Sequence, residues 1–383
     1  MGLSLQTTEQ VNARRRKAAG RATSKDEGSS LCTLKQQLYR LFLQAHPAVQ
    51  DIVEERVDFS TFAEFDAEIV DTDNLPQVRA LRNHYLRLFV NMHRINDMRW
   101  LNKYFLTVHE HLRRGGIFIG MGDTLEIRKD KFFKRYPPFV APVLFVFNFF
   151  YARIMPKLPG LKKVYFTLSQ GQNRALSKAE ILGRLSYCGF KILAITETGD
   201  NFYFIAKKDR APSTDKNPSY GFIIKLRRIG RGGKPIYIRK FRTMHPYSEY
   251  LQEYVFEQNH LQLNGKFKDD FRITSWGRVM RKYWLDELPQ LFNYIKGDIK
   301  LVGPRALSEH YLTLYPKQLQ ALREEFKPGL IPPYYVDLPQ SFDEIIESEK
   351  RYFERKLKHR FLTDDIYFCR AMFNILIRRA RSV

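Results

Sequence analysis

The sequence predicts an α/β protein with an N-terminal α/β region and a C-terminal α+β domain. Residues 95–112 carry apolar side chains at helical spacing. A double glycine at 115–116 follows, and an apolar strand comes next at 117–119. This order makes a helix, turn and strand unit. Residues 225–244 contain two strand-like runs joined by a glycine-rich turn at 230–233, which predicts a basic β-hairpin. Several short helices are expected after the hairpin.

The composition favours a folded protein that binds an anionic partner. The chain has 383 residues, of which 44% are hydrophobic and 14% aromatic, enough for two or three domains with proper cores. Lys and Arg number 64 against 41 Asp and Glu, a formal charge of +23, so nucleic acid and a phospholipid surface are both candidate partners. The widely spaced Cys32, Cys188 and Cys369 argue against a disulfide framework or a zinc site and fit a reducing, cytoplasmic setting. The polar, basic first thirty residues do not resemble a cleavable signal peptide.

The N-terminal region begins with a segment that differs from the rest in composition. Residues 1–30 are rich in Arg, Lys, Ser and Gly and are expected to form a disordered basic tail. In residues 31–135, the helix, double glycine and strand resemble the later half of a class I methyltransferase domain. That family's first glycine-rich loop has no match upstream, and Gly120-Met121-Gly122 is a weak one. We therefore expect a degenerate methyltransferase-like region that serves as a scaffold.

Residues 136–156 form a hydrophobic segment with two possible roles. Residues 139–152 contain no charge and have basic neighbours on both sides. Fourteen residues fall short of the about twenty apolar residues that span a bilayer, and prolines at 137, 138 and 142 would bend a helix. The segment either inserts into one leaflet of a membrane or packs as a helix in a domain core.

Residues 157–208 are expected to complete the N-terminal domain as a small α/β module. Residues 177–180 form a capping box that opens a helix ending at Gly189, and 190–194 and 202–206 predict a strand pair. A polar linker at 209–219 follows, and the C-terminal domain occupies 220–383. Residues 366–383 alternate apolar and Arg side chains, which predicts an amphipathic helix that lies on anionic lipid or presents an ordinary solvated face.

An adjacent acid pair, Asp286-Glu287, is the first candidate site. It precedes an apolar periodic run that stops at Gly297, so Asp286 is predicted to cap a short helix, where the helix dipole favours the ionised form. Arg281 and Lys282 lie about one turn earlier and are suited to orient a phosphate. A plain helix cap without function is the simpler alternative.

Three motifs near the acid pair, taken together, resemble the bacterial sugar transferases. This family consists of the monotopic polyprenyl-phosphate phosphoglycosyl transferases. The first motif is KFRTM at 240–244, and the second runs from Asp270 through Arg272, Thr274 and Gly277 to LDELPQL at 285–291. The third is KGDIKLVGPR at 296–305. Their joint occurrence in this order is specific, whereas each motif alone is weak. The resemblance covers about residues 218–380.

The resemblance implies a reaction and a role for each matching residue. Asp286 would attack the β-phosphorus of a UDP-sugar, release UMP and hold a phospho-sugar, which a polyprenyl (undecaprenyl) phosphate would then accept. Glu287 would help to bind Mg²⁺ or to position the substrate, so the candidate metal ligands are Asp286 and Glu287. The candidate phosphate- or nucleotide-binding residues are Lys240, Arg242, Arg281, Arg305 and Glu349. Solvated strand ends are the alternative for Lys240 and Arg242.

The chain departs from the family pattern downstream of the acid pair. Ala306 stands where the family has a proline, residues 327–335 replace the family's KPGITGLWQVSGR region, and Glu349 stands in place of an aspartate. These changes leave the phosphoryl chemistry in place. They put in doubt which nucleotide-sugar the site selects.

The resemblance further implies a membrane-associated, monotopic enzyme. It would act at the cytoplasmic face of the bacterial inner membrane, in the first membrane step of surface glycan (exopolysaccharide) assembly, with anionic membrane lipid as a partner and without nucleic acid. A basic nucleic-acid-binding protein and a non-catalytic membrane-surface scaffold are the alternatives. The sequence leaves open the sugar, the polyprenol length and the oligomeric state.

Overall fold

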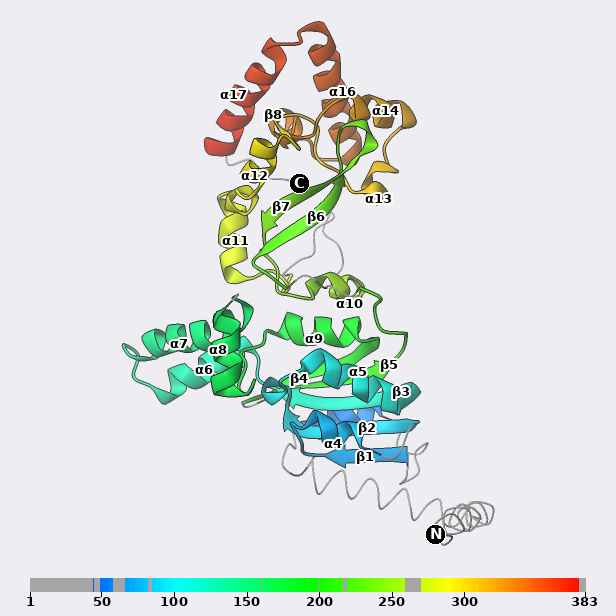
Figure 1. The fold of residues 1–383 in the computed structure, drawn as a ribbon, viewed down its shortest axis with the longest axis vertical. Helices are drawn as coiled ribbons and strands as arrows, with labels where there is room; N and C mark the ends of the chain where they lie inside the picture. Colours follow the sequence, from blue (N-terminus) through cyan, green and yellow to red (C-terminus); the bar gives the residue numbers. More distant parts are fainter. Residues whose placement is uncertain are drawn as a thin grey trace, which may run out of the picture. The chain divides into compact units, whose positions relative to one another are not determined.

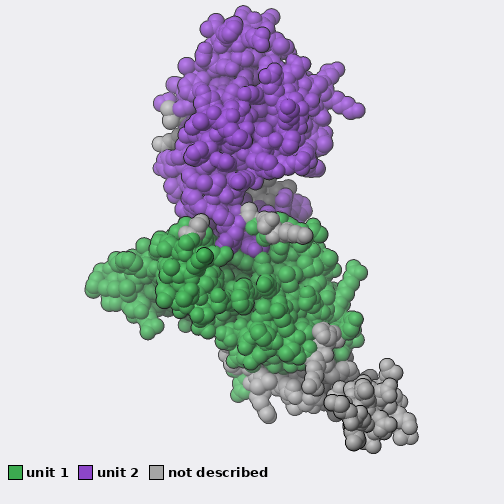
Figure 2. Space-filling view, viewed as in Figure 1, with its two compact units in different colours: residues 1–218 green, residues 219–383 purple. Residues whose placement is uncertain are grey.

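The computed structural model describes most of the chain as two compact units. The described residues are 44, 49–57, 66–81, 85–158, 160–198, 200–215, 218, 220–258 and 270–378, so the predicted tail at 1–30 lies outside them. Unit 1 is residues 1–218 and unit 2 is residues 219–383 (Figure 2). Both units combine sheets with helices, which confirms the α/β class.

Unit 1 contains a mixed five-stranded sheet (Figure 1). Its strands, in the order β1-β2-β3-β5-β4, are β1 Ala67–Val70, β2 Leu86–Arg94, β3 Leu112–Gly122, β5 Asn201–Lys208 and β4 Phe190–Thr198. Strands β1, β2 and β3 are parallel, whereas β5 is antiparallel to both neighbours. The accompanying helices are α3 Gln50–Arg56, α4 Leu75–Arg79, α5 Leu101–His111 and α9 Lys178–Tyr187.

Successive residues along the central strands point to opposite faces, and apolar side chains occupy both faces of this sheet. Leu88 and Val90 pack in a cluster with Val53 of α3. Phe118 instead contacts Phe105 of α5, with ring centroids 5.9 Å apart. Residues on successive positions of a strand point to opposite faces, so helices cover both sides of the sheet.

The double glycine lies inside a strand and does not form the predicted turn before it. The helix expected at 95–112 begins as α5 only at Leu101, after a 3₁₀ turn at Ile95–Asp97, and β3 starts at Leu112. Pairing with β2 shifts between Leu86↔Leu112 and Leu88↔Ile117, so the glycines occupy a bulge. A Cβ on Gly116 would lie 2.9 Å from the Leu86 carbonyl oxygen, which explains why glycine fits there.

The predicted helix and strand pair of the small module are confirmed. Ser177 caps α9, because its side chain accepts a hydrogen bond from the Glu180 N–H at 3.2 Å. Strands β4 and β5 pair in antiparallel fashion. The Glu180 carboxylate is fully buried between Arg153 and Arg184. Burial opposes its ionisation, but Arg153, Lys157 and Arg184 hold the pKa of Glu180 well below its usual range.

Residues 125–169 form a group of helices that we call the helical arm. Its elements are α6 Leu125–Arg135, α7 Ala141–Phe149, a π-helical turn at Phe150–Ile154, a 3₁₀ turn at Met155–Lys157 and α8 Leu161–Ser169. The three α-helices stand away from the sheet (Figure 1). Only Ala141 of α7 is buried, so α7 is not a core helix of the sheet domain. Among the described residues, every helix is too short or too polar to cross a bilayer.

Unit 2 begins with the predicted hairpin, and short helices follow it. Strands β6 Ile223–Ile229 and β7 Pro235–Phe241 are antiparallel, and positive φ angles of 67° and 69° at Gly232 and Gly233 turn the chain between them. Strands β8 Lys300–Val302 and β9 Gly329–Ile331 form a parallel pair. The helices are α10 Gln252–Gln258, α11 Ser275–Lys282, α12 Gln290–Lys296, α13 Glu309–Leu312, α14 Lys317–Glu325, α15 Tyr334–Asp337, α16 Phe342–Lys358 and α17 Leu362–Leu376.

The core of unit 2 lies under β8 and β9 and joins the hairpin to the last two helices. Ile238 of β7 packs in one cluster with Val302, Ile331 and the fully buried Tyr352 and Phe353 of α16. The C-terminal amphipathic helix expected from residue 366 is α17, which starts slightly earlier, at Leu362. Residues 379–383 lie outside the described part.

Candidate active site

The second motif docks α11 onto the end of the hairpin. Arg272 binds the Asp270 carboxylate through two nitrogens, at 2.8 and 2.7 Å. Thr274 caps α11 by accepting from the Gly277 N–H at 2.9 Å, and its hydroxyl donates to the Thr243 carbonyl at 3.0 Å. A Cβ on Gly277 would lie 2.1 Å from that same carbonyl oxygen. The motif therefore builds a helix start that needs glycine for its close backbone approach.

Arg281 lies in the last turn of α11, near the acid pair. Its Nε donates to the Thr243 hydroxyl at 2.9 Å, so the segment just after β7 fixes the guanidinium. Burial lowers the pKa of Arg281, and the negative charge of Asp286 opposes that shift. The influence of Asp286 places its carboxylate within electrostatic reach of this cation.

Asp286 does not cap a helix, which corrects the prediction. Asp286 and Glu287 lie in a 3₁₀ turn at Leu285–Glu287, and α12 begins afterwards, with Pro289 at its N-cap position. The left-handed φ of 60° at Trp284 starts the turn, and Pro289, without an N–H, fits a helix start. The plain-cap alternative is therefore wrong, although α12 does end at Gly297 as predicted, with a φ of 79°.

Glu287 is the fully engaged member of the acid pair. Lys240 of β7 binds one of its carboxylate oxygens at 2.6 Å, and Gln290 donates to the other at 2.7 Å. Lys240 is therefore not a freely solvated strand end, because it joins the first motif to the acid pair. Asn293 joins β7 to α12, since its amide NH₂ donates to the Tyr237 carbonyl at 2.8 Å and its amide oxygen accepts from the Arg239 N–H at 3.0 Å.

Asp286 is the open member of the pair. It is half-buried, and no cation within the described part of the chain forms an ion pair with its carboxylate within 4 Å. Burial raises the pKa of Asp286, and the Glu287 charge adds to the effect, while Lys240 and Arg281 oppose it. A carboxylate that lies near cations but forms no ion pair with them is available to attack or bind a substrate.

Arg305 is held at the acid pair by a tight backbone crossing. Gly329 donates its N–H to the Pro304 carbonyl at 2.9 Å, and a Cβ on Gly329 would lie 2.0 Å from the Gly303 nitrogen. The Arg305 guanidinium lies over the Tyr334 ring, 5.8 Å from its centroid. Burial alone would lower the pKa of Arg305, but Tyr334 and Glu287 raise it. Arg305 is therefore a cation on the Glu287 side of the site.

Glu349 and Arg242 occupy positions beneath the surface. Glu349 is fully buried and pairs with Arg323, whose other terminal nitrogen binds the Arg305 carbonyl. Glu349 thus supports the Arg305 loop from the interior. Arg242 is also buried, and its Nε donates to the Gly221 carbonyl at 2.8 Å. Of the predicted site residues, Asp286, Glu287, Lys240, Arg281 and Arg305 come together, whereas Glu349 lies one layer below.

Sequence reasoning missed four residues that build the site. They are Thr243, Gln290, Asn293 and Arg323. The first two lie inside quoted motifs, so a search for polar side chains within those motifs would have found them. Arg323 carries no local signal, because its partner Glu349 is 26 residues away.

The acid pair has the chemistry of a partial Mg²⁺ site. Magnesium is usually held by one or two carboxylates together with substrate phosphates, and Asp286 and Glu287 supply that donor type. Within the residues that the structure describes, no cluster of three or more His, Cys, Asp or Glu side chains forms a complete protein cage. The donor set fits a metal that arrives with a phosphate ligand.

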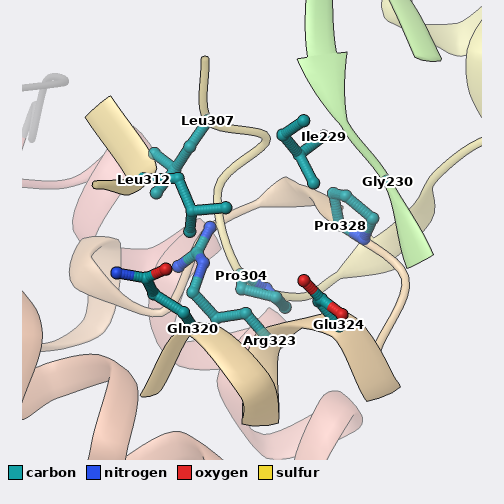
Figure 3. A pocket seen from close by; sticks show the side chains of 9 residues that line it. All are labelled: Ile229, Gly230, Pro304, Leu307, Leu312, Gln320, Arg323, Glu324 and Pro328. Carbon is teal, nitrogen blue, oxygen red and sulfur yellow. The ribbon is translucent and has the colours of Figure 1, made fainter. Parts of the chain in front are cut away.

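A small hollow in unit 2 lies apart from the acid pair (Figure 3). Its lining includes Gly230 at the hairpin turn, Pro304, and Arg323 and Glu324 of α14. Asp286, Glu287 and Lys240 do not line it. The hollow therefore belongs to the support of the Arg305 loop and is not the candidate reaction site.

In unit 2 an open carboxylate lies near three cations, an arrangement whose charges suit a phosphate group. The family model of bacterial sugar transferases matches residues 214–377. Those residues belong to the bacterial sugar transferase family.

Two curated relatives and one solved structure show how far the similarity extends. "Uncharacterized sugar transferase EpsL" of Bacillus subtilis is 46% identical over 103 residues, which cover 27% of this chain and 45% of that protein. The "UDP-glucose:undecaprenyl-phosphate glucose-1-phosphate transferase" of Xanthomonas campestris is 36% identical over 106 residues, 27% of this chain and 20% of that protein. The chain thus covers less than half of either relative. A Methanosarcina mazei SAM-dependent methyltransferase structure matches 35% of this chain and 65% of its own at 13% identity, with a TM-score of 0.23. The methyltransferase-like character of the N-terminal region stays a prediction.

Proposed function

We propose that unit 2 transfers a sugar-1-phosphate from a UDP-sugar to polyprenyl (undecaprenyl) phosphate at the cytoplasmic face of a bacterial inner membrane. This reaction would begin the assembly of a surface glycan. The observation that carries the proposal is the contrast within the acid pair. Glu287 has both oxygens bonded to Lys240 and Gln290, whereas Asp286 is left open beside cations.

The open carboxylate suits a two-step displacement. A carboxylate oxygen of Asp286 attacks the β-phosphorus of the UDP-sugar, and the bond from that phosphorus to the bridging oxygen breaks, so UMP leaves with the electron pair. A phosphate oxygen of the polyprenyl phosphate then attacks the same phosphorus and expels the Asp286 carboxylate. The products are UMP and a polyprenyl diphosphate-sugar, and the bond between the sugar and its oxygen stays intact.

The cations around Asp286 have defined tasks in this scheme. Lys240, fixed by Glu287, and Arg281, fixed by Thr243, are placed to neutralise phosphate oxygens, and Arg305 adds a guanidinium fork. Mg²⁺, held by Asp286 or Glu287 together with substrate phosphates, would stabilise the charge that develops on the leaving group. Glu349 and Arg323 position the Arg305 loop.

Lipid contact by unit 2 fits an acceptor that resides in a membrane. Helix α17 leaves Ile366 and Phe373 exposed, with Arg370 also on its surface. A helix with exposed apolar and basic side chains is suited to an anionic bilayer surface. We expect α17 to hold unit 2 at the leaflet that contains polyprenyl phosphate.

A donor panel tests the reaction. We expect UMP release from one or a few UDP-sugars when the full chain is incubated with Mg²⁺ and polyprenyl phosphate, together with formation of a polyprenyl diphosphate-sugar seen by mass spectrometry. Addition of EDTA should stop release. Absence of UMP from every donor, with folded and lipid-bound protein, would refute the proposal.

The acidic limb of the activity should depend on Lys240. Asp286 must be ionised to attack, so activity rises with pH through its pKa, which burial raises and the Lys240 charge lowers. Replacing Lys240→Met removes the opposing charge, so we expect the acidic limb of UMP release to move to higher pH. The matched control is Lys234→Met, an exposed position at the other end of the hairpin, which should leave the limb in place. A limb that stays fixed or moves to lower pH in Lys240→Met would contradict this role.

A further inference from the structure

The π-helical turn and α7 together present an apolar stripe to the outside. Val143, Val146, Phe147 and Phe150 follow the i, i+3, i+4, i+7 spacing of one helix face. All four are exposed, Phe147 to 69% and Val146 to 64%. A folded protein rarely leaves so many adjacent apolar side chains in water unless they contact something.

Helix α8 presents a second stripe on the same arm. Leu161, Val164 and Leu168 share one face by the same spacing, and Leu168 is exposed to 70%. Tyr165 of α8 is instead buried and meets the Tyr151 ring at 5.2 Å between centroids. Helix α8 thus packs with one side chain and leaves a different face open.

The stripes are exposed although the arm itself is well packed and anchored. Phe132 of α6 packs edge-on against Phe145 of α7, with ring centroids 5.9 Å apart. Arg153 of the π-helical turn is buried, donates to the Ala175 carbonyl at 3.0 Å and pairs with the buried Glu180. The arm therefore has its own aromatic interior and a fixed base, and the outer stripes are additional to both.

Charge decides which partner fits this surface. The helical arm, residues 125–169, contains nine Lys and Arg against two acids, Glu126 and Asp130. Four of these basic residues, Lys134, Arg135, Lys162 and Lys163, are exposed on the arm. Apolar stripes with a basic border match the hydrocarbon boundary and anionic headgroups of a bilayer. A second copy of the arm would bring the same positive charges against each other.

We propose that the helical arm of unit 1 docks on the surface of an anionic lipid bilayer. Val146, Phe147 and Leu168 enter the interface, and the exposed basic residues bind the headgroups. Helix α7 has 9 residues, so the insertion is shallow. This inference deepens the proposed function, on which it rests for the membrane acceptor, by giving the N-terminal unit a second lipid contact of its own.

Vesicle partitioning of the full chain tests the docking. Wild-type protein should bind phosphatidylglycerol-containing vesicles more strongly than pure phosphatidylcholine vesicles. Since two apolar side chains leave the interface in the Val146→Ser, Phe147→Ser double variant, we expect its partitioning to weaken about tenfold or more. The matched control is Tyr85→Ser, because Tyr85 is 78% exposed in the same unit but outside the arm. Unchanged partitioning of the double variant would overturn the proposal.

A site-specific probe separates the arm from lipid contacts of unit 2. In a background with Cys32→Ser and Cys369→Ser, an environment-sensitive dye on Val146→Cys should shift to the blue with anionic vesicles, whereas the same dye on Tyr85→Cys should not. No shift at position 146 would refute docking through the arm. Light scattering that shows a dimer converted to a monomer by the double variant, with unchanged vesicle binding, would assign the surface to a second copy and overturn the proposal.

The proposed reaction can fail independently of the docking. UMP release in detergent micelles, where no bilayer is required, should be equal for wild type and the double variant. Loss of vesicle binding in the variant together with no UMP release from wild type would leave the docking standing and refute the reaction. Normal release with unchanged vesicle binding would do the reverse.

Discussion

Replacing Asp286→Asn is expected to abolish magnesium-dependent UMP release. The amide keeps the size of the side chain but is a far weaker nucleophile, so the rate should fall by more than about 1000-fold. The site otherwise stays intact, because Glu287 keeps its bonds to Lys240 and Gln290. The measurement is UMP release with the preferred donor in the presence of polyprenyl phosphate.

Two further readouts separate a nucleophile from a binding residue. Wild-type protein incubated with donor alone should gain the mass of a phospho-sugar, and Asp286→Asn should not. Asp365→Asn, an exposed acid on α17, is the matched control and should keep both release and adduct. A non-catalytic scaffold predicts equal behaviour of all three proteins, so normal turnover by Asp286→Asn would exclude the nucleophile.

The Arg323→Met substitution is expected to lower the free energy of unfolding more than any other substitution proposed for this protein. The variant leaves the Glu349 charge in the interior without its cation, since Arg323 and Glu349 have side-chain exposures of 8% and 0%. Breaking a buried ion pair by removing one partner costs about 3–5 kcal/mol. The measurement is urea denaturation of the full chain followed by tryptophan fluorescence, with Trp276 and Trp284 reporting on unit 2.

Two comparisons identify burial as the cause of this loss. Arg227 and Glu309 form an exposed pair, with side-chain exposures of 58% and 62%, so Arg227→Met should cost less than about 1 kcal/mol. The double variant Arg323→Met, Glu349→Met removes both charges and should recover much of the loss. Equal costs for Arg323→Met and Arg227→Met would show that the buried pair contributes no more than a surface contact.

Local sequence signals predicted the elements whose causes are themselves local. The hairpin at 225–244 follows from its glycine turn, the start of α9 from the Ser177 cap, and the end of α12 from Gly297. The order of the three motifs along the chain predicted that Lys240 and the acid pair belong to one site. Both kinds of signal lie in residues that can be read side by side.

Long-range contacts account for what the sequence did not predict. Apolar character made residues 139–152 equally suited to a core and to a membrane surface, and only packing against α6 and α8 decides which side chains stay exposed. Asp286 resembled a helix cap because the left-handed turn at Trp284, which postpones the helix, has no sequence signature in a non-glycine residue. The burial of Glu349 depends on Arg323 in a different helix.

The end of β7 and the residues just after it position two parts of the candidate reaction site. Lys240 lies near the end of β7 and Thr243 two residues beyond that end, and they bind Glu287 and Arg281, respectively. One short piece of backbone therefore carries a contact to the acid pair and a contact to Arg281. The spacing of Lys240 and Thr243 along the chain thus helps to set where Glu287 and Arg281 lie in the candidate site.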